Sequence, residues 1–205
     1  MIPPAASRKD LRHKLRARRR ALDAVSRQAA AQKLAALIAD LDCYRSSRHI
    51  AAYMAVEGEM DPEPLMRRAD RDGKQLYLPR LAAGRARMLQ FIRWTPGTRM
   101  QPNRIGIPEP ADDRDGEILP EKLDLVLTPL VAFDRHGQRL GTGGGYYDHT
   151  FAFLKNGATR PLLLGLAYEF QCLEHIETQP WDVPLNSVVT DQHVYYFDAN
   201  TAHTP

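Results

Sequence analysis

The stretch His49-Ile50-Ala51-Ala52-Tyr53-Met54-Ala55-Val56, followed by Asp61-Pro62, decides the fold of this chain. The run is short and apolar and has no helical period, which predicts a strand of a buried sheet. Asp61 before Pro62 has the form of an N-cap followed by a proline at the first helical position. We expect that helix to reach about Asp72, where Gly73 ends it. The sequence therefore predicts a strand–helix unit.

Similar elements follow along the chain. Leu34, Leu37, Ile38 and Leu41 repeat at helical spacing, which predicts a helix at about 26–41. We also expect strands at 75–79, 88–94, 123–128, 162–167 and 193–197, and a helix at about 146–154. This alternation predicts a single α/β domain over residues 1–205, with three α/β/α layers and a mostly parallel, Rossmann-like sheet.

Two segments lack periodicity. Residues 95–120 are rich in proline, so we expect a long irregular loop within the domain. Residues 201–205 are expected to form a frayed tail.

A basic segment precedes this core. Residues 8–20 hold eight basic side chains against one acid and carry a net +7, whereas the whole chain carries +3. Ser7 and Asp10 have the spacing of a capping box, and a stripe of leucines follows, so a basic helix is predicted at about 8–22. We favour a solvated helix docked on the core over a nucleic-acid-binding arm. A third interpretation lies between these two: the helix is docked on the core, and one or two of its basic residues bind a ligand phosphate.

Length and composition predict a soluble globular protein. The chain has 205 residues, of which 43% are hydrophobic, close to the average for globular domains. Its apolar stretches are far shorter than the about 20 residues of a membrane helix, and no secretory signal pattern is present, so we expect a cytoplasmic protein. We also expect a monomer, although no sequence feature decides the oligomeric state. Cys43 and Cys172 have no ligand-like spacing, which argues against a disulfide framework and against a thiolate zinc site.

The segment Arg139-Leu140-Gly141-Thr142-Gly143-Gly144-Gly145-Tyr146-Tyr147-Asp148 carries the chemistry. Glycines allow the backbone to approach a ligand closely and to present N–H groups to an anion at a helix start. The segment fits neither the Walker A pattern nor the dinucleotide fingerprint, and a flexible turn remains the alternative. Arg139 suits phosphate oxygens, and Asp148 is either a Mg²⁺ ligand or an ordinary first-turn acid.

From Phe133 to Asp148, the sequence resembles the signature of the 5-formyltetrahydrofolate cyclo-ligase family. Matching elements spread in order over nearly the whole chain: Leu11-Arg12, Tyr53 to Glu59, Leu78-Pro79-Arg80, Gly106 to Pro110, Gly165 to Gln171, and Asp182 to Asp191. The resemblance implies a sheet like that of sugar-phosphate isomerases and CoA transferases.

The resemblance also implies a reaction. ATP and Mg²⁺ convert 5-formyltetrahydrofolate into 5,10-methenyltetrahydrofolate, ADP and phosphate. Phosphorylation of the formyl oxygen makes it a leaving group, N10 attacks the formyl carbon, and phosphate departs as the ring closes. Such catalysis needs positioned substrates and charge stabilisation rather than a side-chain nucleophile, so we assign no catalytic nucleophile or acid–base residue.

Site residues follow from the same resemblance. The ATP-binding residues it implies are Arg8, Lys9, Arg12, Arg139, Leu140, Gly141, Thr142, Gly143, Gly144, Gly145, Tyr146 and Tyr147. The folate-binding residues it implies are Met54, Glu59, Thr142, Gly143, Gly144, Gly145 and Tyr146. Asp148 and Asp182 are implied as Mg²⁺ ligands. The family has a lysine where this chain has Arg8, with Lys9 next to it, so either residue can fill that role.

Several assignments have open alternatives. Asp182 taken alone is a turn residue, Met54 is equally a core residue, and Glu59 could cap the following helix. Arg80 and His149 have no assigned role. Two other classes of function remain: a nucleic-acid-binding protein, for which we find little support and which leaves the glycine-rich loop unexplained, and a sugar-phosphate isomerase, which needs no ATP.

Overall fold

The structure, a computed structural model, describes residues 7–82, 84, 87–111 and 116–197. The predicted tail at 201–205 lies outside these residues. Within the described part of the chain, no helix is both long enough and apolar enough to cross a membrane.

The helices are mostly where periodicity predicts them. They are α1 Arg8–Arg20, α2 Ala24–Ala39, α3 Asp42–Ser46, α4 Glu63–Arg71 and α5 Tyr146–Thr150, with 3-10 turns η2 Pro120–Lys122, η3 Ala152–Asn156 and η4 Glu169–Gln171. The Ser7 side chain accepts a hydrogen bond from the Asp10 backbone N–H and so caps α1. Asp61 accepts one from the Glu63 N–H, and Gly73 follows α4 with a φ of 73°. The signals at Ser7 and Gly73 are confirmed, whereas α4 begins one residue later than predicted, with Pro62 as its N-cap and Asp61 just before it.

The central sheet has eight strands in the order β13-β12-β10-β7-β1-β2-β3-β6. Its strands are β1 His49–Ala51, β2 Gln75–Leu81, β3 Leu89–Trp94, β6 Glu117–Ile118, β7 Leu125–Pro129, β10 Leu162–Leu166, β12 Ser187–Val189 and β13 Val194–Tyr196. The strands from β12 through β10, β7 and β1 to β2 are parallel to their neighbours, whereas β13, β3 and β6 join by antiparallel pairs. The carboxyl ends of the parallel strands therefore meet at one edge.

Two smaller sheets flank this one. The first consists of β8 Ala132–Asp134, β9 Arg139–Leu140 and β11 Cys172–Leu173, and it leads into the glycine-rich loop. The second pairs β4 Met100–Pro102 with β5 Pro108–Pro110. The segment 95–120, predicted as an irregular loop, thus holds these two strands and β6. Because proline usually argues against a strand, such short strands are not predicted from the sequence, although edge strands can contain proline.

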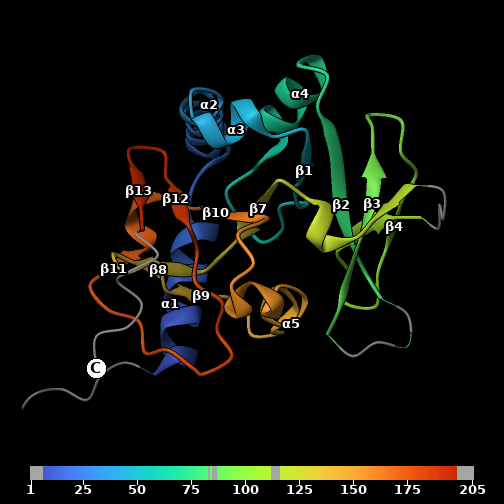
Figure 1. Cartoon of the computed structure of the whole chain (residues 1–205). Coiled ribbons are helices and arrows are strands. Elements are labelled where there is room, and N and C mark those ends of the chain that lie inside the picture. The colour runs from blue at the N-terminus through green and yellow to red at the C-terminus, as the bar shows by residue number, and fades with distance from the viewer. Residues whose placement is uncertain (1–6, 83, 85–86, 112–115, 198–205) are drawn as a thin grey trace, which may run out of the picture.

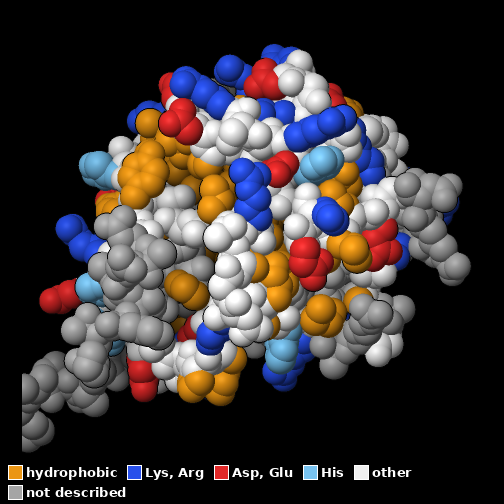
Figure 2. All heavy atoms as spheres, in the orientation of Figure 1, with side chains coloured by type: hydrophobic (Ala, Val, Ile, Leu, Met, Phe, Trp, Pro, Cys, Tyr) orange, Lys and Arg blue, Asp and Glu red, His pale blue; other side chains and the backbone are white. Residues whose placement is uncertain are grey.

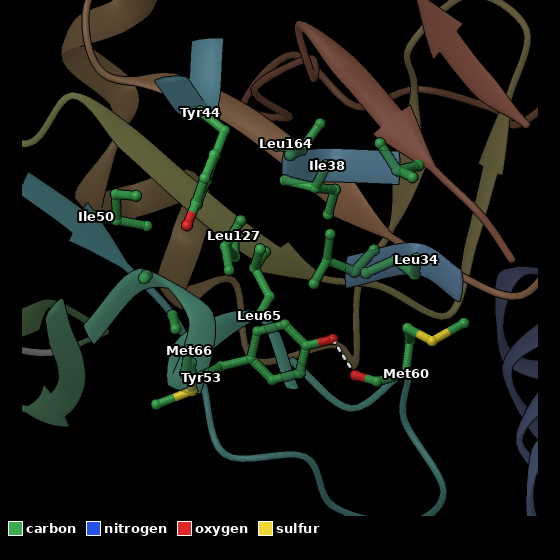
Figure 3. Close-up of a cluster of buried hydrophobic side chains, with 14 of the residues drawn as sticks. Leu34, Ile38, Tyr44, Ile50, Tyr53, Met60, Leu65, Met66, Leu127 and Leu164 are labelled. Atoms are coloured by element: carbon green, nitrogen blue, oxygen red, sulfur yellow. Dashed lines mark hydrogen bonds between the residues drawn. The ribbon is translucent and has the colours of Figure 1, made fainter. Parts of the chain in front are cut away.

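The quoted strand is shorter than predicted. The strand β1 ends at Ala51, and the following residues up to Val56 are irregular. Tyr53 is nevertheless buried and donates a hydrogen bond from its hydroxyl to the Met60 carbonyl at 2.5 Å (Figure 3). An apolar run indicates that a segment is buried but does not show that it is a strand, because buried irregular segments contain the same types of residue.

Two hydrophobic clusters lie on opposite faces of the sheet, since neighbouring residues of a strand point to opposite sides. One cluster combines Ile50, Leu127 and Leu164 with Leu34 of α2 and Leu65 of α4 (Figure 3). The other combines alternate strand residues, such as Val126 and Leu163, with residues of α5 and η3. Figure 1 shows α2, α3 and α4 at the upper side of the sheet and α5 at the lower side.

Candidate functional site

The glycine-rich loop connects β9 to α5. Gly143 and Gly145 have φ angles of 109° and 72°, a region that favours glycine. Among the described residues, the backbone N–H groups of residues 141–145 donate no hydrogen bond to another part of the chain. A run of unpaired N–H groups in a loop with left-handed residues is the arrangement that binds anions.

Helix α1 holds the carbonyl side of this loop. Arg12 donates from Nε to the Gly141 carbonyl at 2.8 Å, and Arg16 donates from Nη2 to the Thr142 carbonyl at 3.0 Å. Burial, followed by repulsion from Arg8 and Arg16, lowers the pKa of Arg12 from its ordinary value. Two loop carbonyls are therefore directed toward cations, and the basic helix is docked on the molecule as predicted.

A buried ion pair joins the two ends of the loop. Arg139 is 5% exposed and donates from Nη2 to Asp148 Oδ1 at 2.6 Å. Its Nη1 donates to the Val183 carbonyl at 2.5 Å, and the Val183 N–H donates back to Asp148 Oδ1 at 3.1 Å. Burial lowers the pKa of Arg139, opposed by the carboxylates of Asp148 and Asp182. The described contacts of Arg139 are internal, so its binding to ATP stays a prediction.

Asp182 directly precedes Val183, whose backbone bonds both members of this ion pair, and Asp182 itself pairs with Arg8 of α1. Its Oδ2 accepts hydrogen bonds from Arg8 Nη1 at 3.0 Å and from the Gln179 N–H at 2.9 Å. Arg8 Nη1 also donates to the Glu177 carbonyl at 2.6 Å. Arg8, Arg12 and Arg139 thus bring Asp182, the glycine-rich loop and Asp148 together at one end of the molecule.

The two predicted metal ligands each keep an oxygen available. In the described part of the chain, Asp148 Oδ2 and Asp182 Oδ1 accept no hydrogen bond. No group of three or more His, Cys, Asp or Glu side chains there is placed to hold a metal. Mg²⁺ is commonly bound by only one or two carboxylates together with phosphate oxygens and water, so this donor set fits it.

Glu59 lies beyond the carboxyl end of β1, at the turn that leads to α4. It is 7% exposed and accepts a hydrogen bond from the Val56 N–H at 3.3 Å. Burial raises the pKa of the Glu59 carboxyl, and the nearby Arg19 opposes this effect. Glu59 does not cap α4, because the N-cap is Pro62 and the side chain that bonds the Glu63 N–H is that of Asp61. Met54, half-buried, packs against the cluster of α2 and α4, which agrees with the core alternative.

A cleft of about 650 Å³ opens beside Glu59. Its walls come from α2, α4 and the segment 55–61, and they carry Arg27, Arg67 and Arg71 as well as Asp61 and Glu63. Figure 2 shows Lys and Arg side chains along the upper edge of the molecule, over α2 and α4. None of the described residues that line this cleft belongs to the glycine-rich loop.

The remaining predicted residues are dispersed. Lys9 is exposed, and Leu140 is fully buried beneath the loop. The Tyr146 hydroxyl accepts a hydrogen bond from Arg104 at 2.9 Å. Burial raises the pKa of Tyr147, whose hydroxyl has no partner among the described residues. His149 is exposed, and Arg80 donates to the Gln90 side chain at 3.1 Å.

Two arginines at the site were missed by sequence reasoning. Arg16 contacts Thr142, and Arg19 Nη2 lies 3.7 Å from Glu59 Oε1. Residues three or four positions apart share a helix face, and Arg8, Arg12, Arg16 and Arg19 have this spacing. That pattern is the signal that could have separated them from the solvated basic residues.

Comparison with known proteins identifies a family for this chain. The model of the 5-formyltetrahydrofolate cyclo-ligase family matches residues 4–191. The 5-formyltetrahydrofolate cyclo-ligase of Escherichia coli K12 is 38% identical over 183 residues, covering 88% of this chain and 98% of the relative. The corresponding Haemophilus influenzae protein is 36% identical over 182 residues, covering 89% and 96%.

Solved structures show the same likeness. The 5,10-methenyltetrahydrofolate synthetase of Aquifex aeolicus superposes with a TM-score of 0.79 at 29% identity, covering 96% of both chains. The Mycoplasma pneumoniae synthetase has a TM-score of 0.71 at 24% identity, which bears on the fold alone, and covers 91% of this chain and all of that one. Sequence and fold thus agree, and the chain belongs to the 5-formyltetrahydrofolate cyclo-ligase family.

Proposed function

We propose that this protein uses ATP to cyclise 5-formyltetrahydrofolate to 5,10-methenyltetrahydrofolate, releasing ADP and phosphate. The observation that carries the proposal is the loop at residues 141–145, whose N–H groups have no partner among the described residues while Arg12 and Arg16 bind its carbonyls. Such a loop suits the phosphates of ATP, and family membership supplies the folate substrate.

The chemistry requires two substrates to be held together. The γ-phosphoryl group moves to the formyl oxygen, N10 attacks the formyl carbon, and the carbon–oxygen bond breaks to release phosphate. Phosphoryl transfer of this kind depends on positioning and on stabilising charge at the phosphate oxygens. Loop N–H groups together with Arg8 and Arg12 can stabilise that charge, and the Glu59 carboxylate can accept hydrogen bonds from the pterin N–H groups.

Of the two candidates on α1, Arg8 rather than Lys9 is the basic residue that we assign to the ATP phosphates. Its guanidinium is held at Asp182 and the Glu177 carbonyl, next to the proposed phosphate site, whereas Lys9 is exposed. The remaining loop residues, from Leu140 to Tyr147, contribute backbone or ring contacts, with residues 142–146 also bordering the folate.

Asp148 and Asp182 are the residues that would hold Mg²⁺. Each has one carboxylate oxygen that accepts no hydrogen bond from the described residues, while its other oxygen is fixed by an arginine. When bound, Mg²⁺ would neutralise charge on the phosphate oxygens of ATP. The pairing arginines, Arg139 and Arg8, orient the carboxylates for this role.

We further propose that residues 1–205 form one domain with α/β/α layers of the sugar-phosphate isomerase type, and that the protein is a cytoplasmic monomer. The two hydrophobic clusters on opposite faces of one sheet support the layered arrangement.

The test is a reaction of the purified protein with 5-formyltetrahydrofolate, ATP and Mg²⁺. We expect the near-ultraviolet absorbance of the methenyl product to rise, with one ADP formed for each product. Omission of ATP, or its replacement by a non-hydrolysable analogue, should abolish the signal. Product formation without nucleotide consumption would overturn the proposal, and so would ATP hydrolysis that is indifferent to the folate.

A further inference from the structure

The last turn of α1 contains a buried cation that the proposed reaction does not account for. Arg19 is 1% exposed, while its neighbours Arg18 and Arg20 are exposed. Burying a guanidinium is costly unless its donors are paired, so such a residue needs a reason to be inside. Burial lowers the pKa of Arg19 from its ordinary value, and the carboxylate of Glu59 makes the largest contribution that opposes this shift.

The hydrogen bonds of Arg19 do not supply that reason. Its Nη1 donates to the Leu130 carbonyl at 3.2 Å, which also accepts from Gln171 Nε2 at 3.1 Å. Its Nε and Nη2 have no hydrogen-bond partner among the described residues. The Leu130 carbonyl, just after β7, therefore fixes one arm of the guanidinium and leaves the other arm directed elsewhere.

That other arm lies at Glu59. Arg19 Nη2 and Glu59 Oε1 are 3.7 Å apart, close enough for an ion pair but longer than a hydrogen bond. The Glu59 carboxylate accepts only the Val56 N–H within the described part of the chain. Most of its acceptor capacity is therefore available, and this carboxylate lies in the wall of the cleft between α2 and α4.

The backbone of the same turn is also pressed against α1. Gly58 has a φ of 72°, and a Cβ atom added there would lie 3.0 Å from the Arg19 carbonyl oxygen. Glu57, with a φ of 50°, pairs with Arg20 at 3.5 Å and with Arg16 at 3.9 Å. The packing of Gly58 against the Arg19 backbone thus fixes the turn at the end of the helix whose earlier turns hold the glycine-rich loop, whereas the exposed pair of Glu57 with Arg20 adds little.

We propose that Arg19 is a positioning residue for folate binding, which holds the Glu59 carboxylate so that its free oxygen positions face the substrate. This inference rests on the proposed function, because it takes Glu59 as the group that meets the pterin N–H donors. Arg19 itself does not touch substrate. Because Arg12, Arg16 and Arg19 share one helix, α1 also fixes the spacing between the phosphate-binding loop and this carboxylate.

The experiment compares Arg19→Met and Arg19→Lys with Arg20→Met in the full chain. Arg20 is a matched control, because it is adjacent on the same helix, pairs with the same turn and is exposed. Steady-state rates are measured while 5-formyltetrahydrofolate and ATP are varied separately, and urea denaturation checks that each variant is folded.

We expect Arg19→Met to raise the KM for the folate at least about tenfold, the factor that follows if a displaced Glu59 carboxylate loses one charge-assisted hydrogen bond from the pterin. The KM for ATP should stay within about twofold, since the ATP contacts of α1 are untouched. Arg19→Lys keeps the charge but not the guanidinium geometry, so it should recover only part of the loss and keep a folate KM above that of the wild type, and Arg20→Met should resemble the wild type. If Arg19→Met does not fold, a raised folate KM in Arg19→Lys with unchanged ATP KM decides in favour.

Combining Arg19→Met or Arg19→Lys with Glu59→Gln provides a second readout that instability alone would not produce. If Arg19 acts through Glu59, its replacement should change the folate KM little once Glu59 has lost its charge. An unchanged folate KM in the single Arg19 variants, equal shifts for both substrates, or additive effects in the double variant would each overturn the inference. An inactive wild type would instead overturn the proposed function.

Discussion

Arg139 donates from Nη2 to Asp148 Oδ1 at 2.6 Å and thereby ties the strand before the glycine-rich loop to the helix after it. Because Arg139 is almost fully buried, this pair contributes to stability as well as to the site. Removal of one partner leaves a buried charge without compensation.

Asp148→Asn should therefore lower the free energy of unfolding by about 3 kcal/mol, in addition to reducing turnover. Urea denaturation of the variant measures the loss. In the double variant with Arg139→Met, we expect a coupling energy of at least about 1 kcal/mol, because the two residues share one interaction. Strictly additive losses would show that the pair does not act as described.

The glycines of the loop should differ in what they tolerate. Gly145 has a φ of 72°, so Gly145→Ala should cost about 1 kcal/mol of stability. At Gly141, an added Cβ would meet nothing within 4 Å, so Gly141→Ala should leave stability within about 0.5 kcal/mol of the wild type. If the loop binds ATP phosphates closely, Gly141→Ala should still raise the KM for ATP. An ATP KM equal to that of the wild type would argue against close approach at this position.

Asp182→Asn should raise the Mg²⁺ concentration needed for half-maximal activity. The substitution removes a carboxylate charge that we assign to the metal, and the affected Arg8 is partly exposed and can be hydrated. A Mg²⁺ titration of activity at saturating ATP measures the effect. Glu177→Gln on the same segment is the control, since Glu177 is exposed and contacts Arg8 only through its carbonyl. Identical Mg²⁺ dependence in both variants would remove Asp182 from the metal site.

Arg8→Gln and Lys9→Gln separate two candidates for one role. Arg8 is held at Asp182, so its replacement should raise the KM for ATP about tenfold, as expected for one charge-assisted contact. Lys9 is exposed, and its replacement should leave the KM for ATP within about twofold. Competition binding of ATP provides an independent measurement. A larger effect from Lys9→Gln would reverse the assignment.

Asp124 gives a pH dependence of stability. Burial would raise the pKa of its carboxyl, but the backbone N–H groups of His49 and Arg48, together with the charges of protonated His49 and of Arg160, outweigh this and leave the pKa below its usual value. The pKa of Asp124 is thus lower in the folded protein than in the unfolded chain. The carboxylate therefore contributes its full stabilisation of the folded state above about pH 4, and this contribution is lost as the pH falls through the pKa of the folded state.

Asp124→Asn should then cost about 1–2 kcal/mol at neutral pH, and the difference from wild type should shrink below about pH 4. Urea denaturation across this range follows both proteins. Asp40→Asn serves as the control, because Asp40 and its partner Arg45 are both exposed. A difference that is constant with pH would contradict the assigned cause.

Local signals predicted the elements that obey periodicity and capping. Ser7 caps α1 as expected and Gly73 follows the end of α4, while Asp61 lies one residue before the N-cap Pro62 of that helix. The strand β12 and the sheet formed by β8, β9 and β11 were missed. These strands are two or three residues long, and their pairing depends on distant partners, so no local pattern reports them.

The site shows the same division. The spacing of the motif predicted the glycine-rich loop and Asp148 as parts of a site, because they lie within one continuous segment. The internal pairing of Arg139 and the contacts of Arg19 with Leu130 and Glu59 could not be predicted in this way. They depend on tertiary packing that joins segments far apart in the chain, and a basic run in a sequence does not show which of its members point inward.

The contacts of α1 also set the order of assembly. Arg12 meets Gly141 across 129 positions of sequence, and Arg8 meets Asp182 across 174. During synthesis, the helix leaves the ribosome early and must wait for nearly the entire sheet before these partners exist. Contacts of such long range slow folding, because the chain loses conformational entropy when it closes the loop, before the contacts that stabilise the loop have formed. A growing chain therefore cannot form the contacts of α1 with Asp182 until that loop has left the ribosome.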